Sequence, residues 1–241
     1  MFCWGSNQFG QVGSGSSQPT YTTPSPVANP RDPAVVWVDM ALGEANSCAL
    51  TDTNRVFCWG RARDGTNGND NLSNNMYSPD QADAGDLVNQ LYGHGNTMYA
   101  LTPSGGMYAW GLNDQGQSGN PSYLDAQLKG GLFVMSNILM VVSGPSFAMA
   151  FQDNDGVVSL LSWGGNERGQ LGLGSADAVV RQPTPIVPPA GFMWRTYSFG
   201  LYVWGNNSSG ALASADSMGG IVSTPMFNPL EFSSIAGGFS C

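Results

Sequence analysis

Five Trp-Gly dipeptides recur along this chain at intervals of 41 to 55 residues, and each opens a similar turn. In the first, third and fourth turns an Asn follows the Trp by three residues, a Gly by six, a Gln by seven and a second Gly by nine. The turns begin at Trp4, Trp59, Trp110, Trp163 and Trp204. Such a period is typical of propellers and solenoids, in which each repeat buries its apolar face against its neighbours. The repeat therefore constrains the fold more than any single motif does.

Strand-like runs surround these turns. Two short apolar runs joined by tight-turn residues precede three of the Trp-Gly pairs, and we predict that each pair of runs forms an antiparallel hairpin. These hairpins lie at residues 46–60, 98–111 and 147–164. Upstream runs that end in Gly have the apolar character of strands buried on both faces. They lie at residues 34–43, 86–93, 137–144 and 230–238.

With a fourth, less regular strand, each repeat would contain the four antiparallel strands of a propeller blade. A helical solenoid is disfavoured, because the chain has 33 Gly and 15 Pro among 241 residues and no long stretch with helical spacing. The prediction is an all-β propeller of about five four-stranded blades in a single domain over residues 1–241.

The repeats resemble those of the regulator-of-chromosome-condensation (RCC1-like) family. A unit of that family has a small-residue strand ending in Gly, then His-Ser-x-Ala-Leu, a turn, and a strand closing in Trp-Gly-x-Asn-x-x-Gly-Gln-Leu-Gly. Besides the Trp-Gly pairs, the matching residues are Ala49-Leu50, Ala100-Leu101, Asn7, Asn113, Asn166, Gln11, Gln117 and Gln170. The position of the family's His is occupied instead by Asn46, Thr97, Phe147 and Phe239, and the turns at 61–67 and 210–213 are degenerate.

The motif residues have a structural explanation. The Gly residues permit tight backbone turns, and each Trp offers a large apolar body that would lie between blades. The motif therefore indicates the fold and not the activity.

The two ends of the sequence complement each other. Residues 1–5 read as the second strand of a hairpin, and residues 235–241 stop where such a hairpin would begin. Strands from both ends could complete one blade and close a ring, which would remove free sheet edges. Alternatively, residues 1–241 belong to a longer chain, since members of the resembled family usually have about seven blades.

The fourth interval is shorter than the others. Between Pro183 and Phe199 there is no counterpart of the apolar strand that ends in Gly. This blade would then be three-stranded, or a segment is missing from the sequence.

The four cysteines occupy matched positions in the repeats. Cys48 and Cys58 face each other across one predicted hairpin, and we expect them to form a disulfide. Cys241 and Cys3 occupy the same two positions in the last and first repeats, so they would pair if the ring closes and would lack partners if it does not. Paired cysteines favour an extracellular, cell-surface or lumenal location over the cytosolic alternative. N-glycosylation motifs begin at Asn71, Asn206 and Asn207.

Charge and hydropathy exclude several partners. There are 17 acidic and 8 scattered basic residues, with a formal net charge of −9. A nucleic acid or an anionic membrane surface requires clustered Lys and Arg, so we expect neither as a partner. No apolar run approaches the length of about 20 residues that a membrane-spanning helix needs, so we expect no membrane insertion.

Catalytic and metal-binding patterns are weak. The single histidine, His94, lies in a Gly-rich turn, so no relay with a second His is available. The Asp-rich stretch from Asp64 to Asp70 lacks the closing Glu of a calcium loop, and no Gly-rich segment has the context of a phosphate site. We expect no catalysis, metal, cofactor or small-molecule substrate.

The leading functional hypothesis is a non-enzymatic protein-interaction scaffold, a subunit of an extracellular or lumenal assembly. The least similar inter-repeat segments would carry the contacts, at residues 14–33, 67–86, 120–129 and 176–191. Aromatic residues and Arg dominate binding hot spots, so the candidate anchors are Tyr21, Tyr77, Tyr123 and Arg181. The resemblance implies the alternative of guanine-nucleotide exchange on a small GTPase, and inhibition of a partner enzyme is a further alternative.

Overall fold

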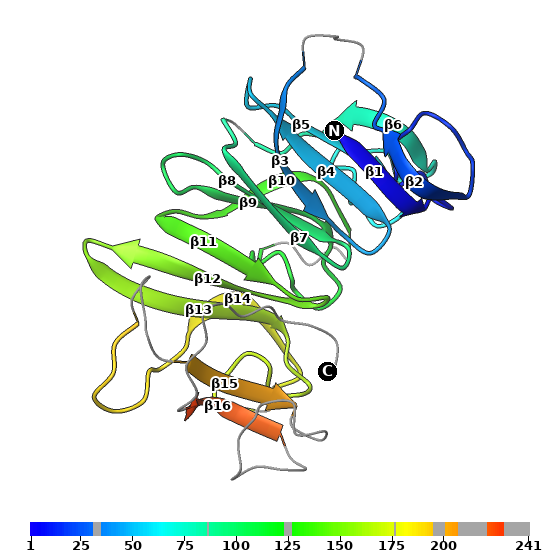
Figure 1. Ribbon diagram of the computed structural model, residues 1–241. Coiled ribbons are helices and arrows are strands. Elements are labelled where there is room, and N and C mark those ends of the chain that lie inside the picture. Colours follow the sequence, from blue (N-terminus) through cyan, green and yellow to red (C-terminus); the bar gives the residue numbers. More distant parts are fainter. Residues whose placement is uncertain are drawn as a thin grey trace. The chain divides into compact units, whose positions relative to one another are not determined.

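The computed structural model of the chain describes residues 1–30, 35–85, 87–122, 127–175, 177–194, 201–206 and 221–228 (Figure 1). For residues 127–129, 201–206 and 221–228 the description covers the backbone alone. The described residues form strands, turns and loops, and none of them belongs to a helix. The described ranges therefore contain no helix that is long and apolar enough to cross a bilayer.

Three antiparallel sheets have four strands each, in chain order, as the prediction of four-stranded blades requires (Figure 1). The first consists of β3 (Trp37–Leu42), β4 (Asn46–Thr51), β5 (Val56–Gly60) and β6 (Met76–Gln81). The second consists of β7 (Gln90–His94), β8 (Thr97–Leu101), β9 (Met107–Leu112) and β10 (Gln127–Met135). The third consists of β11 (Ile138–Ser143), β12 (Phe147–Asn154), β13 (Val157–Gly165) and β14 (Val179–Pro185).

Two further sheets have two described strands each. They pair β1 (Phe2–Ser6) with β2 (Thr20–Pro26), and β15 (Leu201–Asn206) with β16 (Ile221–Asn228). In the short fourth interval, residues 195–200 lie outside the described residues, so the choice between a three-stranded blade and a missing segment stays open. Residues 229–241, with the predicted terminal strand, also lie outside them.

The three predicted hairpins are confirmed as β4–β5, β8–β9 and β12–β13. Their turns contain residues with positive φ, at Asn54 (60°), Gly105 (79°) and Gly156 (86°). Such angles are readily adopted by Gly and tolerated by Asn, which is why the turn residues could be recognised in the sequence. The predicted fourth strand also exists, and β2, β6, β10 and β14 lie within or overlap the four dissimilar segments.

The prediction that the first strand of each blade is buried on both faces is wrong for β3 and β11. On β3, Asp39 and Ala41 are turned toward the next sheet, where the Asp39 carboxylate accepts a hydrogen bond of 2.9 Å from the Leu91 N–H of β7. The alternate side chains are exposed, with Val38 at 56%. On β11, Val142 is exposed at 55% while Val141 is buried. A strand alternates its side chains between two faces, and one face of β3 has no neighbour among the described residues.

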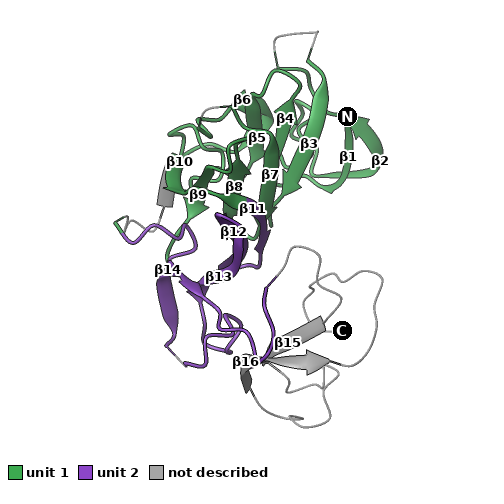
Figure 2. Ribbon diagram, turned by 90° about the vertical axis from the view of Figure 1, so that its left-hand side faces the viewer, with its two compact units in different colours: residues 1–114, 122–138 green, residues 115–121, 139–241 purple. Residues whose placement is uncertain are grey.

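The chain divides into two compact units, residues 1–114 with 122–138 and residues 115–121 with 139–241 (Figure 2). A single domain over residues 1–241 stays a prediction. In the first unit, apolar side chains from the first two complete sheets form one core, which includes Leu50, Met98, Trp110 and both Cys48 and Cys58.

Candidate interaction surface

A hydrogen bond from a Trp side chain to the turn of the preceding repeat recurs three times. The accepting carbonyl belongs in each case to the residue seven positions after the preceding Trp. The bonds are Trp59 Nε1 to Gln11 O (2.9 Å), Trp110 Nε1 to Thr66 O (3.1 Å) and Trp163 Nε1 to Gln117 O (2.7 Å). All three Trp side chains are fully buried. Each Trp therefore joins its own repeat to the one before, and we call this contact the Trp joint.

A glycine of the preceding turn lies against each of these indoles. A Cβ on Gly13 would lie 2.5 Å from Trp59 Nε1, and one on Gly119 would lie 2.8 Å from Trp163 Nε1. Both glycines have positive φ, 73° and 74°, which disfavours other residues as well. Glycine at this motif position thus serves both the turn and the Trp joint, as the structural interpretation of the motif requires.

The motif Asn holds the turn together from within. Asn7 Oδ1 accepts the N–H of Val12 at 3.0 Å, and Asn7 Nδ2 donates to the carbonyls of Ser16 and Gln18 at 3.0 and 2.7 Å. Asn166 repeats this arrangement in the fourth turn, where its Oδ1 accepts the N–H of Leu171 at 3.1 Å. Both Asn side chains are buried, so their bonds replace lost hydration.

The prediction that the tryptophans lie between sheets is wrong for Trp4. Its side chain is 63% exposed, and Phe2 on the same strand is similarly exposed. With this exposure, Trp4 does not form a Trp joint within the described residues. The side chain of Trp204 lies outside the described residues.

The predicted anchors occupy different settings. The Tyr21 hydroxyl and Ser14 Oγ share a hydrogen bond of 2.6 Å, which lowers the pKa of the Tyr21 phenol. The Tyr77 carbonyl accepts the N–H of Gly15 at 2.7 Å. The structure thus brings Tyr21 and Tyr77 to the same loop of the first repeat.

Arg181 lies on β14, where its side chain packs against the turn at Gly116. A Cβ on that glycine would lie 2.8 Å from Arg181 Cγ. At least part of the Arg181 side chain therefore serves packing between repeats. Tyr123 lies outside the described residues, and binding by all four anchors stays a prediction.

Exposed apolar side chains form two candidate contact areas, and sequence reasoning missed the first of them. In the first unit, Val38, Met40 and Leu42 are exposed side by side along β3, and we call them the β3 ridge. Their alternation with Asp39 and Ala41 was visible in the sequence and could have indicated a strand with one uncovered face.

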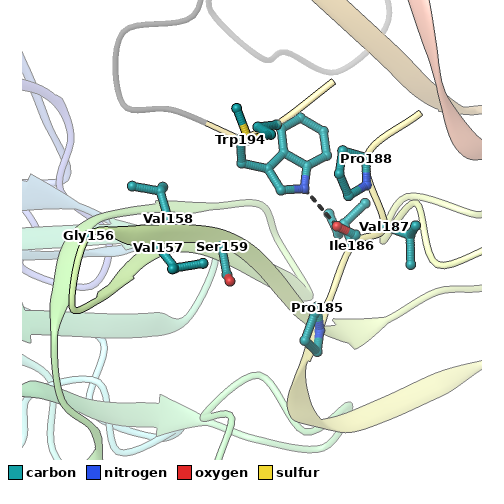
Figure 3. Close-up of a pocket in the computed structure, with 10 residues that line it drawn as sticks. Gly156, Val157, Val158, Ser159, Pro185, Ile186, Val187, Pro188 and Trp194 are labelled. Atoms are coloured by element: carbon teal, nitrogen blue, oxygen red, sulfur yellow. Dashed lines mark hydrogen bonds between the residues drawn. The ribbon is translucent and has the colours of Figure 1, made fainter. Parts of the chain in front are cut away.

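In the second unit, a groove of about 780 Å³ lies between the start of β13 and the segment that follows β14 (Figure 3). Trp194 lines it and donates its Nε1 hydrogen to the Ile186 carbonyl at 2.7 Å, shown as the dashed line in Figure 3. Val157, Pro185 and Pro188 add apolar lining. The groove is apolar with few polar groups, which suits binding more than catalysis.

The structure joins Cys48 and Cys58 in a disulfide between opposed residues of β4 and β5, with their Cα atoms 4.1 Å apart. Cys3 is the free cysteine of the described residues, and its partial burial raises the pKa of its thiol. Cys241 lies outside them, so the Cys3–Cys241 pair stays a prediction. Of the three N-glycosylation motifs, the one at Asn71 lies in a loop. Asn206 is the last residue of β15, where the structure describes the backbone alone, and Asn207 lies outside the described residues.

The residues considered for metal binding have other contacts. Asp64 is buried and forms an ion pair with Arg61, whose guanidinium lies 5.8 Å from the Phe9 ring centroid in the preceding repeat. This contact adds a second link between the first two repeats, and no sequence signal pointed to it because neither Arg61 nor Phe9 belongs to the motif. Within the described ranges, no three His, Cys, Asp or Glu residues are placed to hold a metal ion.

Two models of the regulator of chromosome condensation (RCC1) repeat match the chain, one at residues 37–68 and the other at residues 1–50 and 159–200. Mouse HERC4, named a probable E3 ubiquitin-protein ligase, is 32% identical over 182 residues, which cover 73% of this chain and 17% of that protein. The chain belongs to the RCC1-like repeat family. Human HERC3, likewise named a probable E3 ubiquitin-protein ligase, is 30% identical over 198 residues, or 77% of this RCC1-like chain and 18% of its own length.

Solved structures place the RCC1-like chain in the β-propeller fold. Human WBSCR16 superposes with a TM-score of 0.79 at 22% identity, over 95% of this chain and 61% of that one. Yeast RCC1 (Prp20), solved bound to Kap60, gives 0.77 at 21% identity, over 97% and 61%. At this level of identity the likeness shows the fold alone. The chain also spans less than a fifth of the HERC proteins, so their ligase activity is not carried over to it.

Proposed function

We propose that this RCC1-like chain is a non-enzymatic protein-interaction scaffold that works outside the cytosol, as a subunit of an extracellular or lumenal assembly. The observation that carries the proposal is the β3 ridge, a row of exposed apolar side chains on a strand paired with a disulfide-linked hairpin. Apolar side chains that gather on a surface usually mark a protein contact. A preformed surface loses little conformational entropy on binding, which favours affinity.

Relatives of this fold support a protein partner. One yeast structure contains Kap60 bound to RCC1 (Prp20), and Prp20p from Saccharomyces cerevisiae has binding properties toward Gsp1p and histones. These partners belong to those proteins. For this chain they support contact with proteins as a class, and a net charge of −9 opposes nucleic acid as the direct partner.

The disulfide supports the location outside the cytosol, because cytosolic proteins rarely keep structural disulfides. Peptide mapping of the native protein without reductant tests this part of the proposal. A Cys48–Cys58 linkage is the expected result. Free thiols at both residues would contradict the location and leave the scaffold role to be judged on binding alone.

The scaffold role is tested by charging the β3 ridge. We expect the double variant Val38→Glu/Leu42→Glu to bind its native partner at least about tenfold more weakly, because glutamate would have to lose its hydration in the contact. The partner is recovered from the native source on the wild-type chain and then titrated against each variant. Val142→Glu is the matched control, since Val142 is exposed at 55% in the other unit and lies outside both the ridge and the groove.

Equal affinity of the wild type and the ridge variant, with both proteins folded by circular dichroism, would reject the β3 ridge as the contact. Guanine-nucleotide exchange is the alternative, and it has a separate readout. If the chain accelerated nucleotide release from a small GTPase at catalytic concentrations, the exchange function would replace the scaffold function.

A further inference from the structure

We propose that Asn71 is a site of N-linked glycosylation. The proposal rests on the location outside the cytosol proposed above. Asn71 begins the sequence Asn-Leu-Ser, which matches the acceptor motif for this modification. The surroundings of these three residues in the structure support this assignment.

The motif lies in the loop between β5 and β6, which leaves the turn of the second repeat after Gly68. Asn71 is half-buried, whereas Ser73 and the two residues after it are exposed. The loop is anchored at its base, where Asn69 Nδ2 donates to Asp80 Oδ2 of β6 at 3.0 Å. The motif therefore lies in an anchored loop whose exposed part begins at Ser73.

The hydrogen bonds of Asn71 do not involve its reactive atom, Nδ2. Its Oδ1 accepts the backbone N–H groups of Ser73 at 3.1 Å and Asn74 at 3.2 Å, an arrangement that folds the motif into a turn. Its backbone N–H donates to Asn69 Oδ1 at 3.3 Å. In the described part of the chain, Nδ2 of Asn71 donates to no acceptor, so a new bond at this atom breaks none of these contacts.

A glycan at Asn71 would also leave the Trp joint intact. The joint of the third repeat lies at Gly68, where a Cβ would be 3.1 Å from the Trp110 ring. Gly68 and Trp110 are held on the buried side of the turn, where Trp110 Nε1 donates to Thr66 O. The loop from Asn69 onward carries the motif to the exposed side. Modification is therefore compatible with the folded repeat.

The other motifs differ in setting. Asn206 is the last residue of β15, where it pairs with Ile221 of β16, so its backbone is part of a sheet. Asn207 lies outside the described residues. The proposal is therefore restricted to Asn71.

The transfer requires a polyprenyl pyrophosphate-linked oligosaccharide as donor. A bond forms between Asn71 Nδ2 and the anomeric carbon of the first sugar, and the bond from that carbon to the phosphate oxygen breaks. The pyrophosphate leaves with the bonding electrons, and Nδ2 loses one proton. No oxidation or reduction occurs.

The full chain, directed into the secretory pathway of cultured eukaryotic cells, is the test system. Glycopeptide mapping of the secreted protein should find an oligosaccharide on Asn71, and peptide N-glycosidase should convert Asn71 to Asp. We expect Asn71→Gln and Ser73→Ala to abolish this glycan, and Ser73→Thr to retain it. Asn74→Gln is the matched control, because Asn74 is exposed in the same loop and begins no motif.

An unmodified Asn71 in the secreted wild-type protein would overturn the proposal. A glycan that persists in Ser73→Ala would do the same, because it would show transfer independent of the motif. The location is judged separately from the Cys48–Cys58 linkage in protein from the native source. A native disulfide with a bare Asn71 in the secreted chain rejects the glycan alone.

Discussion

At the scale of single residues, Gly13 shows most clearly why the motif is built as it is. Its φ is positive, and the ring of Trp59 occupies the space that a Cβ would need. Gly15 in the same loop also has a positive φ, 81°, yet the nearest atom to a Cβ there is Ser78 Oγ at 3.6 Å. Alanine substitutions at the two glycines therefore distinguish destabilisation by backbone strain from destabilisation by steric overlap with Trp59.

We predict that Gly13→Ala lowers the free energy of unfolding by about 2 to 5 kcal/mol, as the sum of left-handed strain and overpacking. Gly15→Ala should lower it by about 1 to 2 kcal/mol, from strain alone. Urea unfolding followed by Trp fluorescence measures both. Equal losses for the two variants would show that the contact between Gly13 and Trp59 contributes nothing.

At the scale of elements, the β4–β5 hairpin combines several local signals that agree. Its turn contains Asn54, whose backbone is in the left-handed region. Its strands pair with Cys48 opposite Cys58, as the sequence predicts, and both cysteines lie in the apolar core of the first unit. The disulfide closes a loop with a sequence separation of 10 residues. Loop closure restricts the unfolded chain and so stabilises the folded one.

For the double variant Cys48→Ala/Cys58→Ala we predict a loss of about 2 to 3 kcal/mol in the free energy of unfolding, from the entropy of a loop of this length. Guanidinium unfolding of the wild type with and without reductant should show a loss of similar size. Cys3→Ala serves as the control, because Cys3 has no disulfide partner in the described structure. Identical midpoints with and without reductant would contradict a stabilising disulfide.

At the scale of the whole molecule, local patterns could be predicted and contacts between repeats could not. Hairpins, their turns and the facing cysteines follow from short-range periodicity and turn chemistry, which the sequence displays directly. The acceptors of the Trp joint are backbone carbonyls of Gln11, Thr66 and Gln117, and every residue type has such a carbonyl. The sequence therefore indicated that Trp is buried, without indicating its hydrogen-bond partner.

Exposure was also hard to predict because it depends on neighbouring elements. The apolar runs of β3 and β11 resemble buried strands, yet each has three exposed side chains. They are Val38, Met40 and Leu42 on β3, and Leu139, Met140 and Val142 on β11. Trp4 has the same local sequence as Trp59 and the opposite environment. The β3 ridge was missed for this reason, since contacts were expected on the dissimilar segments and not on uncovered strands. The groove is lined in part by residues 185–188, which belong to one of those dissimilar segments.

The repeats of Trp59, Trp110 and Trp163 are each joined to the preceding repeat through the buried Trp, whose indole N–H is bonded to the preceding turn. Repeats joined in this way should depend for their stability on contacts with their neighbours. The most direct test is hydrogen–deuterium exchange of the assigned indole N–H groups by NMR. We predict strong protection at Trp59, Trp110 and Trp163 and fast exchange at Trp4. Fast exchange at all four indoles, in a protein whose β-sheet amides remain protected, would contradict a joint made by the buried indoles.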